Sequence, residues 1–394
     1  MAQDFIVLMA HVDTHSSRRS APSSRPSQPL VCAKCKGTGA RGIFGRRHGF
    51  GIVRRRCRHC GGTGRSQLAG SASSDSESEP ESWAQNFDVV RCLGKGSFGK
   101  VFQVRGRKAL PGIEIGQDYA MKLLSKQRYG EQQLEKYVYA ERNVLRTGDH
   151  PFLVSLVYAF STFEYWVLIM EYACGGSLAD KLSLQPEENP GFDEDLARRY
   201  ASELLLALDH LHSTSVIFRD LKPDNVVLSS LNQCMLTDFG LVKENFDVAT
   251  GATSVVGSVG YAAPEIIRAR GNSAAAVSYD NTVDWYSLGV CLFVMLSGGD
   301  RLATTEGKVR NRPPRNHGLL MARIRACSSS ADALAAVQQM TDADPTRRGT
   351  AGSIRQLPFF GRISWDELLP QDWKEAKPRL GRTDFAEERR VAVL

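Results

Sequence analysis

Three glycines in the run Gly94-x-Gly96-x-x-Gly99 could bring main-chain NH groups close to a phosphate. Because glycine has no side chain, the backbone can approach an anion there and donate several hydrogen bonds to it. The run lies between two segments that alternate as β-strands do, Phe87–Leu93 and Lys100–Val104. In a Rossmann dinucleotide site the glycines would precede a helix instead. The pattern predicts a phosphate-binding turn between two strands, and as a lone signal it is weak.

Lys122 and Glu141 could extend such a site. Lys122 lies in a predicted strand, Tyr119–Leu124, where it could place a positive charge on nucleotide phosphates or simply face solvent. Glu141 falls on the apolar face of a predicted helix, Glu131–Arg146. The apolar residues on that face are Leu134, Val138, Val144 and Leu145. Since an unpaired carboxylate would be costly among them, the pattern predicts an ion pair between Glu141 and Lys122.

Four polar side chains between residues 220 and 238 have the types that phosphoryl transfer to a hydroxyl would use. Asp220 is the candidate base, which would contribute a factor of about 10²–10⁴ to the rate. Asn225 and Asp238 offer the oxygen ligands that Mg²⁺ prefers, and Lys222 could neutralise charge on the transferred group. The alternative is a polar turn before the apolar strand Val226–Leu228, which does not account for the spacing.

The order of these motifs resembles that of protein kinases. The matching residues are Gly94-x-Gly96-x-x-Gly99, Ala120-Met121-Lys122, Glu141, Phe218-Arg219-Asp220-Leu221-Lys222-Pro223-Asp224-Asn225, Asp238-Phe239-Gly240 and Ala263-Pro264-Glu265. The resemblance implies an α+β, bilobal protein-kinase fold, with a β-rich N-lobe of five strands and one helix before Cys174-Gly175-Gly176 and an α-rich C-lobe after it. Within the C-lobe we expect helices over Glu194–His212 and about Thr282–Leu296.

The resemblance also assigns roles to residues and cofactors. It implies ATP-binding residues Leu93, Gly94, Gly96, Gly99, Val101, Ala120, Lys122, Met170 and Glu171. It implies catalytic residues Asp220, Lys222, Lys122 and Glu141, with Mg²⁺ held by Asn225 and Asp238. Phe218 stands where His or Tyr is more usual, and we expect its ring to pack in the same way.

Within the family, the chain resembles the AGC group of serine/threonine kinases. The residues that carry this resemblance are Leu93–Val101, His150-Pro151-Phe152, Met170-Glu171-Tyr172, Leu357-Pro358-Phe359-Phe360 and Ile363-x-Trp365. The run Leu221-Lys222-Pro223 implies Ser or Thr as the acceptor and therefore protein substrates. Thr253 or Ser254 occupies the place of the group's activation-loop phosphate, which implies an upstream activating kinase. A Ser/Thr-rich loop without a regulatory role is the alternative.

Some positions depart from the group. Members of the group that prefer Arg in their substrates carry carboxylates at three places: after the Gly link (Cys174-Gly175-Gly176), in the catalytic loop, and in the helix after Asp284-Trp285. Here these positions hold Ser177, Asp224 and Val294. Gly260 replaces a usual Glu before Tyr261, and residues 299–340 do not match the group's pattern. A strong preference for basic residues before the acceptor is therefore not expected.

Two CxxCxGxG repeats near the start of the chain have the spacing of a zinc site. Cys32 and Cys35 form the first pair, and Cys57 and Cys60 form the second. Four thiolates suit tetrahedral Zn²⁺, and the repeat resembles half of the zinc-binding region of DnaJ-type chaperones. Redox dithiols or incidental cysteines are the alternatives. The five other cysteines look like packing residues.

Charge and composition place this module in the chain. Residues 1–65 hold 13 Lys and Arg against 2 Asp and Glu, whereas the whole chain carries a net charge of +7. This basic module could attract an acidic partner or nucleic acid, or it could be a solvated tail. The expected domains are a disordered segment 1–30, the zinc module 31–65, an acidic Ser-rich linker 66–84, the kinase domain 85–362 and a C-terminal extension 363–394.

Composition also bounds the compartment and the enzyme class. The longest apolar run near the start, Phe5–Ala10, is too short for a signal peptide or a membrane span, so we expect a cytoplasmic protein. A nuclear location and an organelle transit peptide stay open. A catalytically inactive kinase-fold scaffold acting through the zinc module is the alternative function. Such scaffolds usually lack the lysine, the base or the metal aspartate, and Lys122, Asp220 and Asp238 are all present.

Overall fold

The computed structural model describes residues 40–41, 55–56, 83–95, 99–131, 135–246, 251–252, 254, 256–271, 278–303, 309–369, 373 and 377. The chain divides into two compact units, 1–83 and 84–394. In the first unit β1 (Ala40–Arg41) pairs antiparallel with β2 (Arg55–Arg56). Cys32, Cys35, Cys57 and Cys60, and with them the predicted zinc site, lie outside the described residues. The described helices include none long and apolar enough to cross a bilayer.

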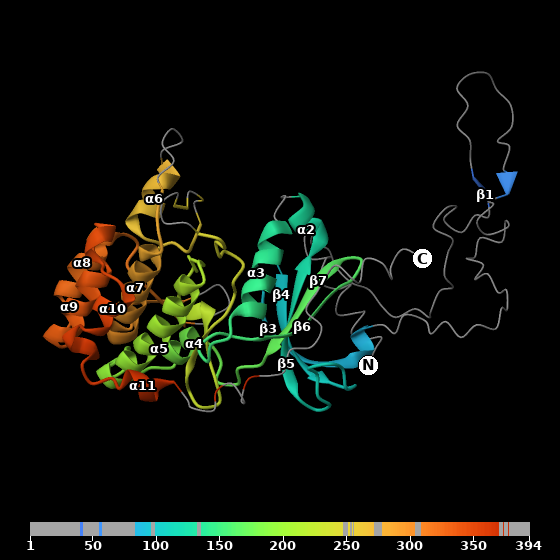
Figure 1. The fold of residues 1–394 in the computed structure, drawn as a ribbon, viewed down its shortest axis with the longest axis horizontal. Helices are drawn as coiled ribbons and strands as arrows, with labels where there is room; N and C mark the ends of the chain where they lie inside the picture. Colours follow the sequence, from blue (N-terminus) through green and yellow to red (C-terminus); the bar gives the residue numbers. More distant parts are fainter. Residues whose placement is uncertain are drawn as a thin grey trace, which may run out of the picture. The chain divides into compact units, whose positions relative to one another are not determined.

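The short 3-10 helix η1 (Trp83–Asn86) starts at the last residue of the first unit and leads into the second. The second unit begins with a five-stranded antiparallel sheet of order β3-β4-β5-β7-β6. The strands are β3 (Phe87–Lys95), β4 (Gly99–Gly106), β5 (Asp118–Ser125), β6 (Leu156–Ser161) and β7 (Tyr165–Glu171). Figure 1 shows α2 and α3 beside this sheet and the helical part of the unit beyond it. In β5, Met121 and Leu123 are buried on the face opposite to Lys122. The predicted β-rich lobe is therefore confirmed.

The helix predicted over 131–146 differs at its start. The structure has α2 (Lys126–Glu131) and then α3 (Glu135–Thr147), and Leu134 falls between them, outside the described residues. Gly130, a poor helix former, precedes the end of α2. Val138, Val144 and Leu145 are buried on α3 as predicted, together with Glu141.

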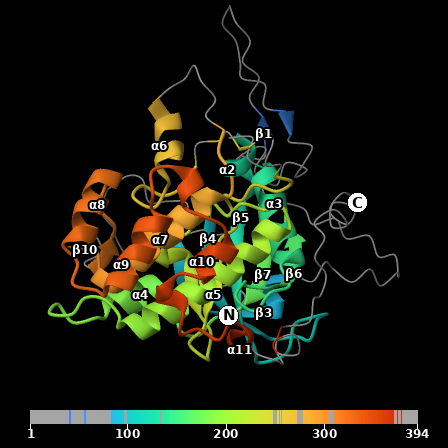
Figure 2. The same cartoon turned by 60° about the vertical axis from the view of Figure 1, so that its left-hand side comes forward.

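The C-lobe is mainly helical, as expected. Its helices are α4 (Leu178–Ser183), α5 (Glu194–Ser213), α6 (Pro264–Gly271), α7 (Thr282–Ser297), α8 (His317–Arg325), α9 (Ala331–Met340), α10 (Ala351–Arg355) and α11 (Trp365–Leu368), with 3-10 turns η2 (Pro223–Asn225), η3 (Pro345–Arg347) and η4 (Pro358–Phe360). Asp193 caps α5 by accepting a hydrogen bond from the Leu196 amide. Helix α7 is buried on almost every side and contacts both α5 and α9, so it forms the centre of this lobe (Figure 2).

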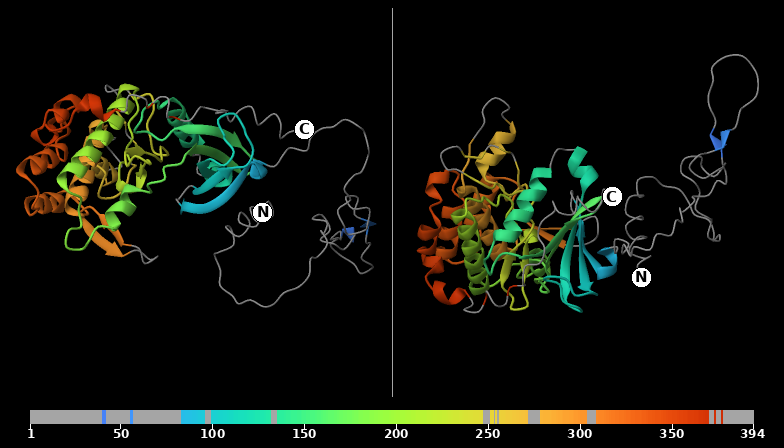
Figure 3. Two further views of the ribbon diagram at one scale, coloured as in Figure 1. Left: turned by 90° about the horizontal axis from the view of Figure 1, so that it is seen from below. Right: turned by 45° about the vertical axis from the view of Figure 1, so that its right-hand side comes forward.

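Two small antiparallel sheets complete the lobe. The first pairs β8 (Val226–Leu228) with β9 (Cys234–Leu236), directly after the predicted catalytic loop. The second pairs β10 (Asp300–Ala303) with β11 (Val309–Arg312), in the segment whose sequence departs from the AGC pattern. Strand β11 packs against α4, and Figure 3 shows this hairpin in orange at the edge of the helical lobe.

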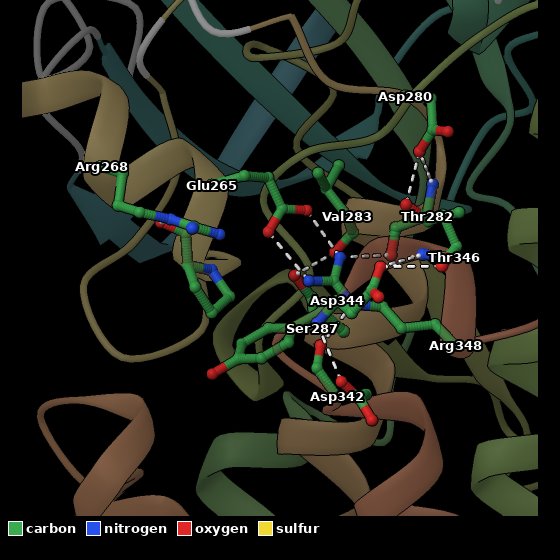
Figure 4. Close-up of polar contacts among 12 residues, drawn as sticks. Glu265, Arg268, Asp280, Thr282, Val283, Ser287, Asp342, Asp344, Thr346 and Arg348 are labelled. Carbon is green, nitrogen blue, oxygen red and sulfur yellow. Dashed lines mark hydrogen bonds and ion pairs between the residues drawn. The ribbon is translucent and has the colours of Figure 1, made fainter.

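A buried ion pair joins α6 to the segment after η3 (Figure 4). Arg348 donates two hydrogen bonds to Glu265, from Nη1 to Oε1 at 2.6 Å and from Nη2 to Oε2 at 2.8 Å. Its Nε donates to the main-chain oxygen of Asp342 at 2.8 Å, and its guanidinium lies 5.1 Å from the centre of the Tyr286 ring. Because the charge of Arg348 is matched and its donors are used, this fully buried arginine can be accommodated.

Candidate active site

Lys122 is held between two carboxylates from different elements. Its Nζ donates to Glu141 Oε1 at 2.5 Å and to Asp238 Oδ1 at 2.7 Å. Lys122 comes from β5, Glu141 from α3, and Asp238 from the loop after β9. Asp238 has a positive φ of 62°, a conformation that is uncommon outside glycine and that clusters at functional sites. The structure thus brings together three of the residues that the sequence predicts for the site.

The three charges fix one another's protonation. Burial alone would lower the pKa of Lys122, but the charges of Asp238 and Glu141 outweigh it and raise that pKa. The positive charge of Lys122 in turn holds the pKa of Asp238 below its usual value. Burial raises the pKa of Glu141, and Lys122 opposes that rise. Lys122 therefore keeps its positive charge at neutral pH, as a phosphate-binding group requires.

Four of the predicted nucleotide-binding residues share one face of the sheet. Val101 lies opposite Lys122 in the pairing of β4 and β5, and Ala120 lies opposite Met170 in the pairing of β5 and β7. Directly opposed residues, and residues two apart along one strand, point to the same face. These four side chains therefore form one surface, with the apolar ones next to the lysine charge.

The two ends of the predicted phosphate turn differ in what they require. A Cβ at Gly99 would lie 2.1 Å from the main-chain oxygen of Leu123, so glycine is needed there for β4 to approach β5. A Cβ at Gly94 would meet nothing within 4 Å, and the neighbouring Leu93 is exposed. Gly96 lies outside the described residues.

The side chain of Glu171 is engaged with other groups of the protein. Its Oε1 accepts hydrogen bonds from the Ser155 amide at 2.5 Å and from Lys377 Nζ at 2.7 Å. Because this carboxylate already has two donors, a nucleotide contact at this predicted residue would fall to the main chain.

Asp220 is surrounded by hydrogen-bond donors. Ser258 Oγ donates to Oδ1 at 2.7 Å, while Lys222 Nζ and Asn225 Nδ2 donate to Oδ2 at 2.7 and 2.9 Å. Lys222 Nζ also donates to Ser258 Oγ at 2.7 Å. These contacts fix the orientation of the carboxylate, which a general base requires. Ser258 therefore belongs to this site.

Asp284 anchors the catalytic loop from inside the lobe. This fully buried residue at the start of α7 accepts hydrogen bonds from the amides of Phe218 and Arg219 at 2.9 and 2.7 Å and from His212 Nε2 at 2.8 Å. Arg219 has a positive φ of 70°, which these bonds help to hold. Asp284 was not predicted as a functional residue, although the pair Asp284-Trp285 stands out in the sequence.

The aromatic residue before Arg219 packs as the sequence predicts. Phe218 is buried, and its ring centre lies 5.6 Å from that of Phe239 in an edge-to-face arrangement. This contact joins the loop that carries Asp220 to the loop that carries Asp238.

Asn225 and Asp238 have the donor set that Mg²⁺ prefers. The amide nitrogen of Asn225 is engaged with Asp220, through hydrogen bonds to Oδ2 and to the main-chain oxygen, both at 2.9 Å. The side-chain oxygen of Asn225 is therefore the atom available to a cation. The main chain of Asn225 pairs with the amide of Thr237 at 3.0 Å, next to Asp238. One carboxylate and one amide oxygen fit Mg²⁺, which usually takes few protein ligands.

Arg219 also reaches the activation segment. Its Nη1 donates to Ser254 Oγ at 2.5 Å and to Tyr279 Oη at 3.1 Å, and Tyr279 Oη donates to the main-chain oxygen of Ser254 at 2.6 Å. Ile217 and Lys243 form a β-bridge on the same loop, and Lys243 is exposed. Thr253 lies outside the described residues. The structure thus places one of the two predicted regulatory residues beside Arg219.

Comparison with known proteins agrees with this geometry. Residues 87–360 match the family described as "Protein kinase domain". The chain is 34% identical over 312 residues to the serine/threonine-protein kinase AtPK2/AtPK19 of Arabidopsis thaliana, covering 77% of this chain and 61% of that protein. It is 35% identical to a RAC family serine/threonine-protein kinase homolog of Dictyostelium discoideum, covering 73% and 60%. It is 37% identical to human ribosomal protein S6 kinase alpha-6, covering 76% and 38%. The chain therefore spans about three fifths or less of the length of these relatives.

Proposed function

The chain belongs to the protein kinase family, and from this premise we propose that it transfers the γ-phosphate of ATP to Ser or Thr hydroxyls of protein substrates. The observation that carries the proposal is the arrangement around Asp220, which Ser258, Lys222 and Asn225 hold by hydrogen bonds of 2.7–2.9 Å. The names of the similar serine/threonine kinases support the acceptor type.

In this proposal each residue has one task. Asp220 accepts the proton of the attacking hydroxyl, and Lys222 offsets negative charge on the transferred group. Lys122, oriented by Glu141, binds the phosphates of ATP. Mg²⁺, when bound by Asn225 and Asp238, neutralises phosphate charge. Val101, Ala120 and Met170 provide the apolar surface for the adenine ring of ATP, and the main chain near Glu171 lies at the edge of this surface.

The proposal is tested by incubating the purified chain with γ-labelled ATP, Mg²⁺ and degenerate peptides that offer Ser, Thr or Tyr as the acceptor. We expect label on Ser and Thr peptides, no label on Tyr peptides, and a near-complete loss with Asp220→Asn. An absence of label on every peptide, with a folded and ATP-binding protein, would contradict the proposal.

We further propose that phosphorylation of Ser254 by an upstream kinase raises activity. The hydroxyl of Ser254 already lies 2.5 Å from Arg219, so a phosphate there would form a charge-assisted contact beside the catalytic loop. Thr253 is the alternative acceptor. Separate Ser254→Ala and Thr253→Ala variants, assayed after treatment with an activating extract and again after phosphatase, identify the residue. Equal activity of all forms would exclude this regulation.

We also propose that Cys32, Cys35, Cys57 and Cys60 bind one Zn²⁺ and that the basic module around them contacts an acidic partner. The pairing of Ala40 with Arg56 supports this proposal, because Cys57 follows Arg56 directly in the chain. Metal analysis of the intact protein should give one zinc per chain, and none when Cys57 and Cys60 are both replaced by Ser. An unchanged zinc content would rule out this assignment.

A further inference from the structure

The hairpin β10–β11 lies where the sequence departs from the AGC pattern, and it carries unusual charge. Residues 300–315 include five basic residues and two acidic ones. The basic residues are Arg301, Lys308, Arg310, Arg312 and Arg315. Side-chain hydrogen bonds hold the hairpin to the lobe. Asn311, which is buried, donates from Nδ2 to the main-chain oxygen of Gly298 at 2.6 Å, and Arg301 donates from Nη1 to the main-chain oxygen of Gln185 at 2.7 Å. Within the hairpin, Arg312 pairs with Asp300 in the strand register.

Strand β11 presents two arginines on the face opposite to Asn311. Arg310 and Arg312 are two residues apart and so point to the same side of the strand. Arg310 Nη1 donates to Asp180 Oδ1 at 2.8 Å, which ties this side of the hairpin to α4. The carboxylate of Asp180 also accepts a hydrogen bond from Ser177 Oγ at 2.7 Å. The acidic group on α4 is thus already neutralised by the hairpin.

The end of the hairpin reaches the loop that holds Ser258. A Cβ at Gly260 would lie 2.7 Å from Pro313 Cγ, and Gly260 has a positive φ of 90°. Both features disfavour the Glu that AGC kinases usually carry at this position. Ser258, two residues earlier, donates to Asp220 at 2.7 Å. Arg312 is next to Pro313 in the chain, Pro313 lies against Gly260, and Gly260 is two residues from Ser258. Arg312 is therefore close to Asp220, beside which the acceptor hydroxyl would bind.

The electrostatics of Tyr261 agree with this placement. Burial, and then the nearby Cys291 and Asp224, raise the pKa of Tyr261, while Arg312 opposes the rise. Arg312 is exposed, and its guanidinium forms no hydrogen bond or ion pair with the other described residues. Of the acidic positions used by Arg-directed members, Asp224 alone keeps its carboxylate.

We propose that Arg312 is a specificity-determining residue that selects protein substrates with an acidic side chain close to the acceptor Ser or Thr. The favoured side chains are Asp, Glu or a phosphorylated Ser, whose anionic oxygens match the guanidinium. This inference rests on the proposed kinase function. Repulsion between Arg312 and basic substrate residues adds to the selection.

The test measures kcat/KM on peptides that differ at single positions around the acceptor, each carrying Asp, phosphoserine, Ala or Arg. For the native chain we expect the acidic peptides to exceed the Arg peptides by roughly five-fold or more at one or more positions. Comparison of the phosphoserine peptides with the Asp peptides shows whether Arg312 prefers a phosphate or a carboxylate. The Arg312→Glu variant should invert the ratio of acidic to basic peptides, and the exposed Arg347→Glu variant should leave the ratio unchanged.

The ratio separates the two proposals. A general loss of activity lowers the rates on acidic and basic peptides together and leaves their ratio unchanged. If the native chain phosphorylates Ala peptides but treats Asp and Arg alike, the role of Arg312 is overturned while the kinase function stands. If Arg312→Glu keeps the native ratio, the selection comes from another residue and the inference is wrong. If no peptide is phosphorylated, both proposals fail.

Discussion

At the scale of single residues, Asp220 differs from the other carboxylates of the site in the groups that surround it. Glu141 and Asp238 both bind Lys122, so their role is to hold a charge in place. Asp220 instead accepts from a hydroxyl, an ammonium and an amide, and lies at the end of the loop held by Asp284. A base needs this combination of fixed position and access to the substrate hydroxyl.

Replacing Asp220 by Asn tests that distinction. The amide keeps the size of the side chain and an oxygen acceptor but cannot take up a proton at neutral pH. We expect kcat to fall by about 10²–10⁴-fold with little change in the KM for ATP, because Asp220 does not bind the nucleotide in our proposal. Steady-state kinetics on a Ser peptide measures both constants.

The matched control is Asp332→Asn on the exposed face of α9, which should retain full activity. A fall in kcat of less than about ten-fold for Asp220→Asn would mean that the residue does not act as the base.

At the scale of elements, the sequence predicts what depends on local periodicity. The alternation along Tyr119–Leu124 and the apolar face of α3 predict that Lys122 and Glu141 face each other. In the structure Lys122 Nζ lies 2.5 Å from Glu141 Oε1. Helices α5 and α7 end within one residue of their predicted limits. Apolar periodicity indicates which face of a helix is buried. Because a buried carboxylate without a partner is costly, the position of Glu141 on that face predicts a cation nearby.

Other contacts between elements leave no trace in such patterns. Asp284 and Phe218 are 66 residues apart in the chain. Nothing in the sequence around either residue indicates that the Asp284 carboxylate accepts a hydrogen bond from the Phe218 amide. The hairpin β10–β11 lacks a tight-turn signal, so its pairing was not predicted. Arg310 of this hairpin pairs with Asp180 of α4, and Pro313, which follows the hairpin, lies against the loop at Gly260. Such partners are decided by tertiary packing, which a single sequence does not encode locally.

The ion pair between Glu265 and Arg348 tests how strongly such contacts hold the helices. Arg348→Met removes the charge and leaves Glu265 buried without its partner (Figure 4). Breaking a buried pair in this way costs about 3–5 kcal/mol of unfolding free energy. Chemical denaturation of both proteins measures the difference.

The neighbouring Arg347 offers a matched control. Its side chain is exposed and forms only a 3.6 Å pair with Asp344, so Arg347→Met should cost less than about 1 kcal/mol. Equal losses for the two variants would mean that the pair with Glu265 contributes no more than a surface contact.

At the scale of the whole molecule, His150 joins segments that are distant in the sequence. Its ring stacks on His210 of α5 with centres 5.0 Å apart and lies 6.3 Å from the ring of Trp373. Its Nδ1 accepts from the Phe152 amide at 3.3 Å. Lys377, four residues after Trp373, donates to Glu171 beside the Gly link. The two lobes and the C-terminal segment therefore meet around a buried imidazole.

The surroundings of His150 make this meeting point sensitive to acid. Burial, together with smaller contributions from the charges of His210 and Lys377, lowers the pKa of His150 to about 3. In the unfolded chain its pKa is about 6.5, so the unfolded state takes up the proton first as the pH falls. The native state should then lose about 1.4 kcal/mol of unfolding free energy for each pH unit below about 6.5. Above that pH the imidazole is neutral in both states, and this contribution does not change.

A His150→Asn variant keeps an acceptor for the Phe152 amide and cannot be protonated. Its stability relative to the native chain at pH 7.5 measures the packing lost, because neither protein titrates at this position there. Between pH 7.5 and 5 the native chain should lose about 2 kcal/mol more than the variant, so the two stabilities approach each other. Urea unfolding at several pH values measures this change. A constant difference across the range would show that His150 is not the group that takes up the proton.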